Sequence, residues 1–435
     1  MSKNLIFIFE FVSGGGFSRI NIPTSLFCEG FGMLRSIIAD FKALDFEIYT
    51  ILDQRIFFLS NFLEADIIRI VNENDDYLSI FKETVKNCYY TFIIAPETSN
   101  ILYNLTKIVN NCNKIVLSTN LKGIKYGTSK IKTYQLFENK KILSPRTYSI
   151  PYKKTHFNND FIIEKFKRLK KPIVIKPEDG VGAESIYYFE EKSQLLNFLK
   201  DINTNLNNNR SYILQEFIDG RNLSISLIGA PYIDKNPLIL SVNSQDINIK
   251  NLTPEYLGGH TPSSNYKGII EKLSSNLKKM KSLKIEGYFG IDFIEEPNGS
   301  LYFIEINPRL TTSYIGLRNI INLNCADLIY KSRVNILKNP EVKLNNYSMF
   351  TRIDFYSDEF ENIEEFYEDY MPKLIKLIPE FVTPPIALED PHLYSCFIAT
   401  KTKDLNSSKI RINKIFESLK SLNFKVIKPI QKELS

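Results

Sequence analysis

Three oxygen-bearing side chains lie in two apolar runs near residue 300. Asp292 is in the first run, Glu305 and Asn307 are in the second, and a Pro-Asn-Gly turn at 297–299 separates them. Because Glu305 and Asn307 are two residues apart, both project to one face of a strand, and a hairpin partner brings Asp292 to that face. Two acids buried together are costly unless they are compensated, and such oxygen ligands suit Mg²⁺ bridging ATP phosphates. The flanking Phe, Ile and Leu residues disfavour the alternative, a chance pair of acids facing solvent.

A strand that leads into a glycine-containing turn is the second candidate. The apolar run 173–175 ends at Lys176, and a turn with Gly180 and Gly182 begins within four residues. A cation and unhindered backbone N–H groups that converge in this way suit a polyphosphate. The stretch matches neither of the common nucleotide motifs, GxxxxGK[ST] and GxGxxG. An ordinary hairpin turn after a strand explains it equally well.

The stretch 212–220 reads as a buried strand that leads into a connector. A purine held in such a connector needs an apolar wall and one or two hydrogen bonds to its amino edge. Leu214, Phe217 and Ile218 could form the wall, and Glu216 or its neighbouring backbone could supply the polar contacts. A strand in the core of a sandwich would look the same, so this stretch alone does not decide between the two interpretations.

The length and composition describe the scaffold that must hold these residues. The chain has 435 residues, of which 43% are hydrophobic and 24% charged, which predicts two or three folded domains and excludes a disordered or fibrous protein. The net charge of +6 is spread along the chain and forms no basic block, so we expect no nucleic acid partner. Five separated cysteines and three histidines offer neither a disulfide framework nor a zinc site, so any metal must be held mainly by oxygen.

The expected secondary structure divides the chain into three successive stretches. Before about residue 120, strands alternate with helices, which predicts a small parallel sheet with covering helices; the expected strands are 4–12, 46–52, 91–95 and 114–118, with a helix at 24–44. After a helix at 128–140, short strands at 173–175, 185–189, 211–217 and 222–229 favour antiparallel pairing. From about residue 340 the pattern restarts, with a strand at 348–355, acidic helical residues at 358–369, and strand, helix and strand from 393 to 428.

These elements predict an α/β and α+β chain of three units. They are an N-terminal α/β domain at 1–122, a two-part nucleotide-binding domain at 123–338, and a small α+β unit at 339–435. No stretch approaches the roughly 20 apolar residues of a membrane span. We therefore expect a cytoplasmic protein without a membrane partner.

In chain order, the lysine–glycine turn, the connector and the hairpin resemble the ATP-grasp superfamily of carboxylate-amine ligases over roughly residues 125–335. The resemblance implies an ATP-grasp fold behind a Rossmann-like pre-ATP-grasp domain, with ATP and Mg²⁺ (or Mn²⁺) as cofactors. It also implies roles for matching residues: Lys130 and Lys176 for the phosphates, Gly180, Val181 and Gly182 for the loop over them, Gln215, Glu216, Phe217 and Ile218 for adenine, Asp292, Glu305 and Asn307 for the metal, and Arg309 with Lys176 for catalysis. One departure is Asn222, where many relatives place a ribose-binding glutamate near this point, so ribose contacts are not assigned.

A narrower resemblance rests on residues 306–318, on the Phe-Glu-Phe-Val-Ser-Gly-Gly-Gly stretch at 9–16 and on the Tyr-Leu-Gly-Gly stretch at 256–259. These resemble the archaeal-type ATP-grasp enzymes that include tyramine-glutamate ligase of methanofuran biosynthesis. The resemblance implies acyl-phosphate chemistry that joins an amino-acid carboxylate, such as glutamate, to a primary amine, such as tyramine. Substrate residues expected on this basis are Gly14, Gly15, Gly258, Gly259, His260, Thr311, Thr312 and Tyr314.

Several alternatives stay open at this point. Glu10 and Glu29 are weighed as amine-binding residues against a plain role at the ends of elements. The ligase could act on a different amino acid or on a peptide, and a non-catalytic nucleotide-binding regulatory protein is the rival from another class. The expected partners are small-molecule amino acids and amines. A homodimer and the role of residues 340–435 are left open.

Overall fold

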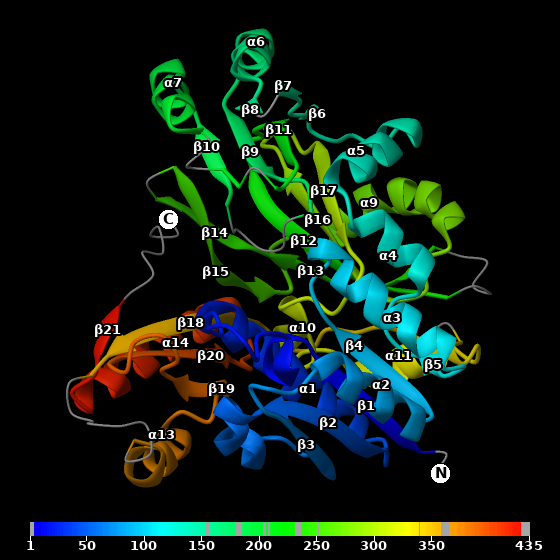
Figure 1. Cartoon of the computed structure of the whole chain (residues 1–435), viewed down its shortest axis with the longest axis vertical. Helices are drawn as coiled ribbons and strands as arrows, with labels where there is room; N and C mark the ends of the chain where they lie inside the picture. Colours follow the sequence, from blue (N-terminus) through cyan, green and yellow to red (C-terminus); the bar gives the residue numbers. More distant parts are fainter. Residues whose placement is uncertain are drawn as a thin grey trace.

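A computed structural model gives the fold of the chain (Figure 1). It describes residues 4–153, 156–179, 185–202, 206–207, 209–230, 236–250, 252–338, 340–357 and 366–427. The predicted loop at Gly180, Val181 and Gly182 and most of the acidic segment 358–369 lie outside these described residues.

The N-terminal residues form the predicted parallel sheet, with strand order β3-β2-β1-β4-β5. The central strands are apolar and fully buried because helices cover both faces. Strand β3 and helix α2 were not predicted, and the glycine stretch Val12–Gly16 forms a short helical turn. The elements are β1 (Leu5–Glu10), α1 (Thr24–Lys42), β2 (Glu47–Asp53), a 3₁₀ segment (Gln54–Phe62), β3 (Ile67–Val71), α2 (Tyr77–Asn87), β4 (Tyr90–Ile94), a short turn (Thr98–Asn100), α3 (Ile101–Asn111) and β5 (Ile115–Val116).

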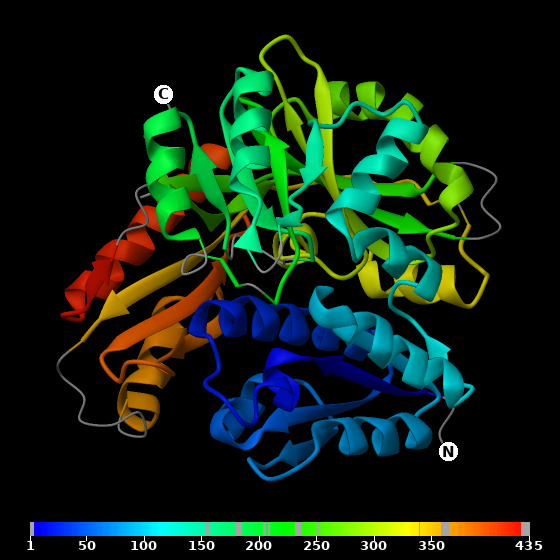
Figure 2. The same cartoon turned by 45° about the horizontal axis from the view of Figure 1, so that its top comes forward.

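Helix α1 lies between this sheet and the rest of the molecule (Figure 2). A Cβ at Gly32 of α1 would meet both Ile315 at 3.0 Å and Thr383, which comes from the C-terminal unit, at 3.1 Å. The Thr383 hydroxyl donates to the Cys28 carbonyl at 2.6 Å, and Arg35 donates to the Phe381 carbonyl at 2.9 Å. One helix therefore contacts all three parts of the chain.

The middle of the chain builds two antiparallel sheets. The first has the order β10-β9-β11-β6, and apolar residues of α6 and α7 pack on it. The elements here are α4 (Leu121–Gly127), α5 (Lys130–Asn139), β6 (Thr147–Ser149), the two-strand pair β7 (Tyr152–Lys153) and β8 (His156–Phe157), α6 (Asn159–Leu169), β9 (Ile173–Pro177), β10 (Tyr187–Phe189), α7 (Lys192–Lys200) and β11 (Tyr212–Glu216).

The second antiparallel sheet, β13-β12-β16-β17, contains the predicted hairpin. Alternate residues of β16 and β17 are buried together with the apolar side of α9. The elements are β12 (Arg221–Gly229), β13 (Leu238–Ser244), α9 (Tyr266–Met280), a 3₁₀ turn (Lys281–Leu283), β16 (Gly287–Glu295), β17 (Leu301–Asn307), α10 (Ser313–Leu317) and α11 (Cys325–Arg333).

The C-terminal residues share a sheet with the middle of the chain. Its order is β14-β15-β18-β20-β19, and β21 also pairs with β18. Because β15 pairs with β18, backbone hydrogen bonds cross the predicted boundary at residue 338, and that boundary stays a prediction. The elements are β14 (Asp246–Lys250), β15 (Thr253–Thr261), β18 (Ser348–Tyr356), a helical turn (Phe366–Tyr370), α13 (Met371–Leu377), β19 (Phe381–Ile386), β20 (Leu393–Ala399), α14 (Leu405–Ser421) and β21 (Lys425–Ile427). In the described parts, no helix is long and apolar enough to cross a membrane.

Candidate active site

The β16–β17 hairpin brings the three predicted oxygen ligands together. Asp292 lies directly opposite Glu305, and Gly290 lies opposite Asn307. Asn307 Nδ2 donates to Asp292 Oδ2 at 2.9 Å, and Gln245 Nε2, from the connection between β13 and β14, donates to Asp292 Oδ1 at 3.1 Å. The three side chains therefore form one polar patch toward the end of the hairpin that is opposite its turn. We call this the inner end, and the end at the turn the outer end.

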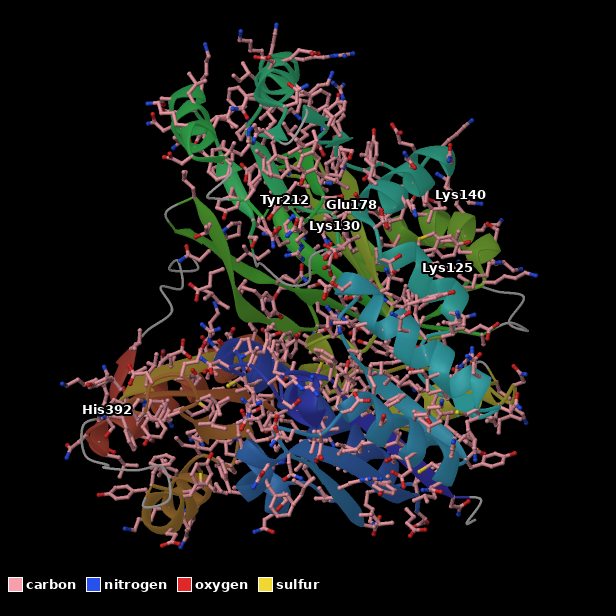
Figure 3. All side chains as sticks on the ribbon, viewed as in Figure 1. Lys125, Lys130, Lys140, Glu178, Tyr212 and His392 are labelled. Atoms are coloured by element: carbon pink, nitrogen blue, oxygen red, sulfur yellow. The ribbon has the colours of Figure 1, made fainter. Side chains whose placement is uncertain are left out.

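Two lysines approach this patch from other elements. Lys130 begins α5, its backbone N–H donates to the Glu178 carbonyl at 3.0 Å, and its Nζ lies 2.9 Å from Glu305 Oε2. Figure 3 shows Lys130 and Glu178 close together at the end of β9. Lys176, in β9, is only 7% exposed and interacts electrostatically with Glu305 and Asp292. Residues from α5, β9 and the hairpin thus meet at one place.

The charges in this cluster shift one another's pKa values. Burial lowers the pKa of Lys176 to about 8, although the negative charge of Glu305 acts in the opposite direction. Burial and the charge of Glu305 raise the pKa of Asp292. Burial also opposes the charge of Glu305, but Lys130 and Lys176 outweigh it and hold the pKa of Glu305 below its usual value. The cluster therefore keeps two cations and two acids in a poorly hydrated place.

The donor set fits a hard divalent cation. Carboxylate and amide oxygens are the ligands that Mg²⁺ prefers in proteins, usually with phosphate oxygens completing the set. The Asn307 amide nitrogen is committed to Asp292, and its Oδ1 accepts no hydrogen bond from a described residue. Asp292, Glu305 and Asn307 could therefore hold Mg²⁺ or Mn²⁺ between them.

Arg309 connects the hairpin to the N-terminal domain. Its Nε lies 3.1 Å from Glu97 Oε2, and its Nη1 donates to the Leu310 carbonyl. Glu97 follows β4 and is 5% exposed, and its Oε1 has no hydrogen-bond partner among the described residues. The predicted catalytic arginine is thus held at the contact between two parts of the chain.

The side chains of the predicted adenine connector are largely committed within the protein. Gln215 Nε2 donates to the Thr147 hydroxyl at 2.8 Å, and Glu216 pairs with Lys171 at 2.7 Å. The Phe217 N–H donates to the Pro172 carbonyl at 2.9 Å, whereas Ile218 is buried. Apolar surface and backbone groups, rather than the Gln and Glu side chains, are what this connector could offer a base. Asn222 on β12 lies opposite Ile294 on β16, the first strand of the hairpin.

The expected substrate glycines have close neighbours within the protein. A Cβ at Gly14 would meet the Phe9 ring at 2.4 Å, and Gly15 has a φ of +92° and lies against Val71. A Cβ at Gly258 would meet the Phe350 carbonyl at 2.1 Å, and one at Gly259 would meet the Ser244 carbonyl at 2.1 Å. Close packing therefore accounts for these glycines without a ligand. A substrate role for them stays a prediction.

The remaining expected threonines and tyrosine differ in the residues to which they are hydrogen-bonded. Tyr314 is fully buried and its hydroxyl donates to Asp40 at 2.6 Å, and Thr311 is hydrogen-bonded to Tyr288 at 2.9 Å. Thr312 instead donates to Glu29 Oε2 on helix α1 at 2.7 Å.

His260 is held away from water on β15. Its Nδ1 lies 2.5 Å from the Ser244 hydroxyl, and its Nε2 is buried without a described partner. Burial, and then the positive charges of Lys409 and Arg221, lower its pKa to about 4. A neutral imidazole is therefore expected near neutral pH.

Two residues of the site were not predicted. Glu97 follows the carboxyl end of a parallel strand, where such sheets collect functional groups, so its position was a usable signal. Gln245 lies between two strands of different sheets and carries no local signal, because only tertiary folding brings it to Asp292.

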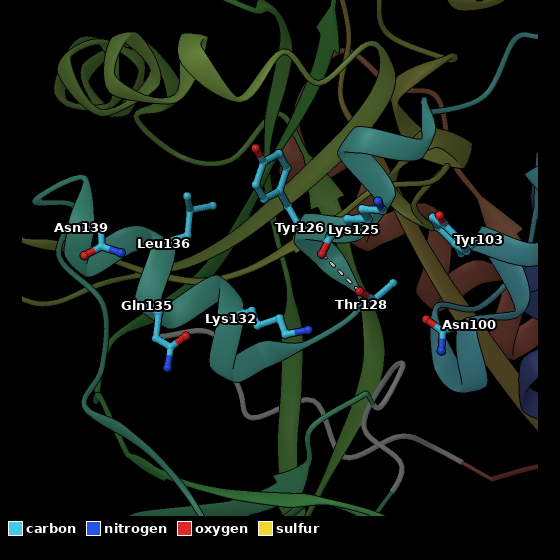
Figure 4. A pocket seen from close by; sticks show the side chains of 9 residues that line it. All are labelled: Asn100, Tyr103, Lys125, Tyr126, Thr128, Lys132, Gln135, Leu136 and Asn139. Atoms are coloured by element: carbon cyan, nitrogen blue, oxygen red, sulfur yellow. Dashed lines mark hydrogen bonds between the residues drawn. The ribbon is translucent and has the colours of Figure 1, made fainter. Parts of the chain in front are cut away.

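A separate surface pocket of about 570 Å³ lies between α3, α4 and α5 (Figure 4). Lys132, Gln135 and Asn139 line it, and they lie about half a turn round α5 from Lys130. The pocket thus opens on the side of α5 that faces away from the hairpin, and it is not the candidate active site. Its other lining residues are Asn100, Tyr103, Lys125, Tyr126, Thr128 and Leu136.

Comparison with domain families agrees with this architecture. Residues 128–313 match an ATP-grasp domain and residues 46–124 match a pre-ATP-grasp domain. These ranges include the hairpin acids, Lys130, Lys176 and Arg309. The predicted ATP-grasp fold is therefore confirmed.

Individual relatives cover most of the chain. It is 29% identical over 339 residues to tyramine–L-glutamate ligase of Methanocaldococcus jannaschii, spanning 77% of this chain and 91% of the relative. It is 27% identical to the same-named ligase of Methanocaldococcus fervens, over 76% of this chain and 94% of the relative. Among solved structures, the biotin carboxylase domain dimer of Hydrogenobacter thermophilus 2-oxoglutarate carboxylase, in complex with MgADP, aligns with a TM-score of 0.68 at 13% identity. That alignment covers 97% of this chain and 90% of the other.

Proposed function

This chain is an ATP-grasp protein with a pre-ATP-grasp domain, and we propose that it is an ATP-dependent ligase joining an amino-acid carboxylate to a primary amine. The observation that best supports this proposal is the cluster of Asp292, Glu305, Lys130 and Lys176 at the inner end of the hairpin. Buried acids beside buried lysines suit a metal-bound triphosphate, because the ligand supplies both a cation for the acids and anions for the lysines.

The residues around the hairpin would divide the work of holding ATP. Lys130 and Lys176 would face the phosphate oxygens, and Asp292, Glu305 and Asn307 would hold the metal. Mg²⁺, when bound, would neutralise phosphate charge and favour attack at the γ-phosphorus. Arg309 would orient the transferred phosphoryl group and is kept in place by Glu97, which holds its guanidinium 3.1 Å away.

The reaction that we propose has two steps. A carboxylate oxygen attacks the γ-phosphorus, and the bond from this phosphorus to the oxygen of the β-phosphate breaks. ADP is released and an acyl-phosphate is formed. The neutral amine then attacks the acyl carbon, the bond to the phosphate oxygen breaks, and phosphate leaves with the amide formed. Lys176 and Arg309 would stabilise the negative charge on the transferred group in both steps.

Glutamate and tyramine are the first substrates to test. The two relatives described above carry these compounds in their names and match this chain over about three quarters of its length. Tetrahydromethanopterin:α-L-glutamate ligase, also from Methanocaldococcus jannaschii, is 27% identical over half of this chain, so glutamate is the substrate that the names of all three relatives share.

The proposal is tested by ADP release from purified protein, Mg-ATP and a matrix of amino acids and amines. We expect ADP and phosphate only when an acid and an amine are both present, with glutamate and tyramine as the strongest pair. ADP release with another pair would change the proposed substrates and still support the ligase function. Nucleotide binding without ADP release for every pair would favour the non-catalytic regulatory protein.

Light scattering in the same buffer would test the homodimer, which we retain as a proposal because the H. thermophilus domain was solved as a dimer.

A further inference from the structure

Helix α1 presents two carboxylates to the segment after the hairpin: Asp40, which pairs with Arg318 at 2.6 Å, and Glu29, which has no such partner among the described residues. Glu29 is half-buried, and its Oε2 accepts a hydrogen bond from the Thr312 hydroxyl at 2.7 Å. Thr312 follows Arg309 in the loop that leaves the hairpin. Glu29 is therefore tied directly to the segment that carries the predicted catalytic arginine.

Glu29 has no cationic partner among the described residues. Arg309 and Arg352 lie near enough to lower its pKa, but each is committed elsewhere. Arg309 pairs with Glu97, and Arg352 lies 3.2 Å from Glu255 and 3.1 Å from Asp354. Burial outweighs these influences and raises the pKa of Glu29. A half-buried carboxylate in this state is stabilised by any cation that enters.

Tyr256 lies on β15 opposite Ile247 of β14, two residues beyond Gln245, whose side chain donates to Asp292 of the hairpin. Its ring is half-buried on β15, and its hydroxyl forms no hydrogen bond with a described residue. Burial, and then the charges of Glu29, Asp246 and Asp292, raise the pKa of Tyr256 well above its usual value. The Tyr256 side chain thus lies within electrostatic range of both Glu29 and the hairpin.

Glu10 shows what a structural carboxylate looks like in the same domain. It is 3% exposed, and it accepts hydrogen bonds from the backbone N–H groups of Val12 at 2.9 Å and Ser13 at 2.7 Å. It also packs against Gly30, where a Cβ would meet its carboxyl carbon at 2.7 Å. Fixed backbone donors satisfy Glu10, so it needs no ligand, whereas Glu29 receives one hydroxyl donor from the described residues.

We propose that Glu29 binds the ammonium of the amine substrate and accepts its proton, with the Tyr256 ring beside the bound amine. This inference rests on the proposed ligase function. One proton passes from the ammonium to the Glu29 carboxylate, which leaves a neutral amine. The amine nitrogen then forms the C–N bond, the acyl C–O bond to phosphate breaks, and the second proton leaves with phosphate. Asp246 adds negative charge on the Tyr256 side of the subsite.

The test compares wild type, Glu29→Gln, Glu29→Asp and a matched control, Glu47→Gln, whose side chain is exposed at the start of β2. Initial rates are measured against tyramine concentration at saturating Mg-ATP and glutamate. We expect Glu29→Gln to raise the KM for tyramine at least about tenfold, since a charge-assisted hydrogen bond is lost. Glu29→Asp should recover part of the loss, and Glu47→Gln should match wild type.

Hydroxylamine separates this inference from the proposed function. It is largely uncharged near neutral pH and can intercept an acyl-phosphate without an ammonium site. Glutamyl hydroxamate formed by Glu29→Gln at a wild-type rate, together with the raised tyramine KM, would support the inference and show that the variant is folded. An unchanged tyramine KM in Glu29→Gln would overturn the inference alone. No hydroxamate from wild type would overturn the proposed function.

Discussion

The two ends of the β16–β17 hairpin both carry acids faced by two cations, but their surroundings differ. At the inner end, Glu305 faces Lys130 and Lys176, whose side chains are almost completely buried. At the outer end, Glu295 pairs with Arg221 and Lys272, whose side chains are 49% and 45% exposed.

The difference indicates that the outer ion pairs are structural and that the inner ones belong to a ligand site. Glu295 itself is buried, but water and nearby salt screen its two half-exposed cations, which belong to the neighbouring strand β12 and to helix α9. The inner cluster draws its cations from α5 and β9, and burial lowers the pKa of Lys176 to about 8. An arrangement that is unfavourable for its own cation is typical of a site built for a ligand. Number and sign of charges alone would not distinguish the two ends.

Exchange of the inner acid should give the largest effect. We expect Glu305→Gln to lower kcat for ADP release by about 10³-fold, because the proposed metal ligand and the partner of Lys130 are lost together. Steady-state ADP release with glutamate and tyramine measures this. Glu295→Gln, an acid on the same hairpin with two cations of its own, is the matched control and should stay close to wild type. Equal losses in the two variants would remove the distinction between the ends.

The pH dependence of nucleotide binding should distinguish the inner lysine from the outer one. The free protein holds the pKa of Lys176 at about 8, below the usual range for lysine, so the ammonium loses its proton as the pH rises through that value. In its proposed role, Lys176 binds the phosphate oxygens in its charged form. The affinity for Mg-ATP should therefore fall by up to about tenfold per pH unit above about pH 8.

Calorimetric titration between about pH 7.5 and about pH 9.5 measures this slope. Lys176→Met should bind Mg-ATP more weakly throughout this range and lose the slope. Lys272→Met, at the outer end, should keep it. A wild-type affinity that stays constant to the top of the range would contradict the role of Lys176.

The smallest effect is expected at the outer end. Although Glu295 is buried, Glu295→Gln should lower the free energy of unfolding by only about 1 kcal/mol, because its two partners are half exposed and the amide can still accept a hydrogen bond. Urea denaturation followed by circular dichroism measures this change. A loss of several kcal/mol would mean that the outer cluster holds the hairpin together and is not a screened surface pair.

Local patterns predicted the parts of the molecule that depend on neighbours in sequence. The hairpin could be predicted because apolar alternation and the Pro-Asn-Gly turn specify two paired strands, and the spacing of Glu305 and Asn307 then places both on one face. The parallel sheet followed from apolar runs between helices. Strand β3 was missed because it is short and only half-buried at the edge of that sheet.

Contacts that depend on assembly of the sheets could not be predicted. The pairing of β15 with β18 joins residues that are about 90 positions apart, and no local pattern marks it. Glu97 reaches Arg309 across 212 positions, and Glu29 reaches Thr312 across 283. The glycines at 258 and 259 suggested a ligand loop, but close strand packing explains them equally well. The sequence therefore predicted the arrangement of the hairpin acids better than the contacts of the expected substrate residues.

Transfer of labelled oxygen tests the central claim most directly. Wild-type protein is incubated with Mg-ATP, tyramine and glutamate whose carboxylates carry ¹⁸O, and the released phosphate is analysed by mass spectrometry. If the hairpin site activates a carboxylate as an acyl-phosphate, each phosphate will carry a labelled oxygen and the nucleotide product will be ADP. Unlabelled phosphate, or AMP with pyrophosphate, would contradict the account.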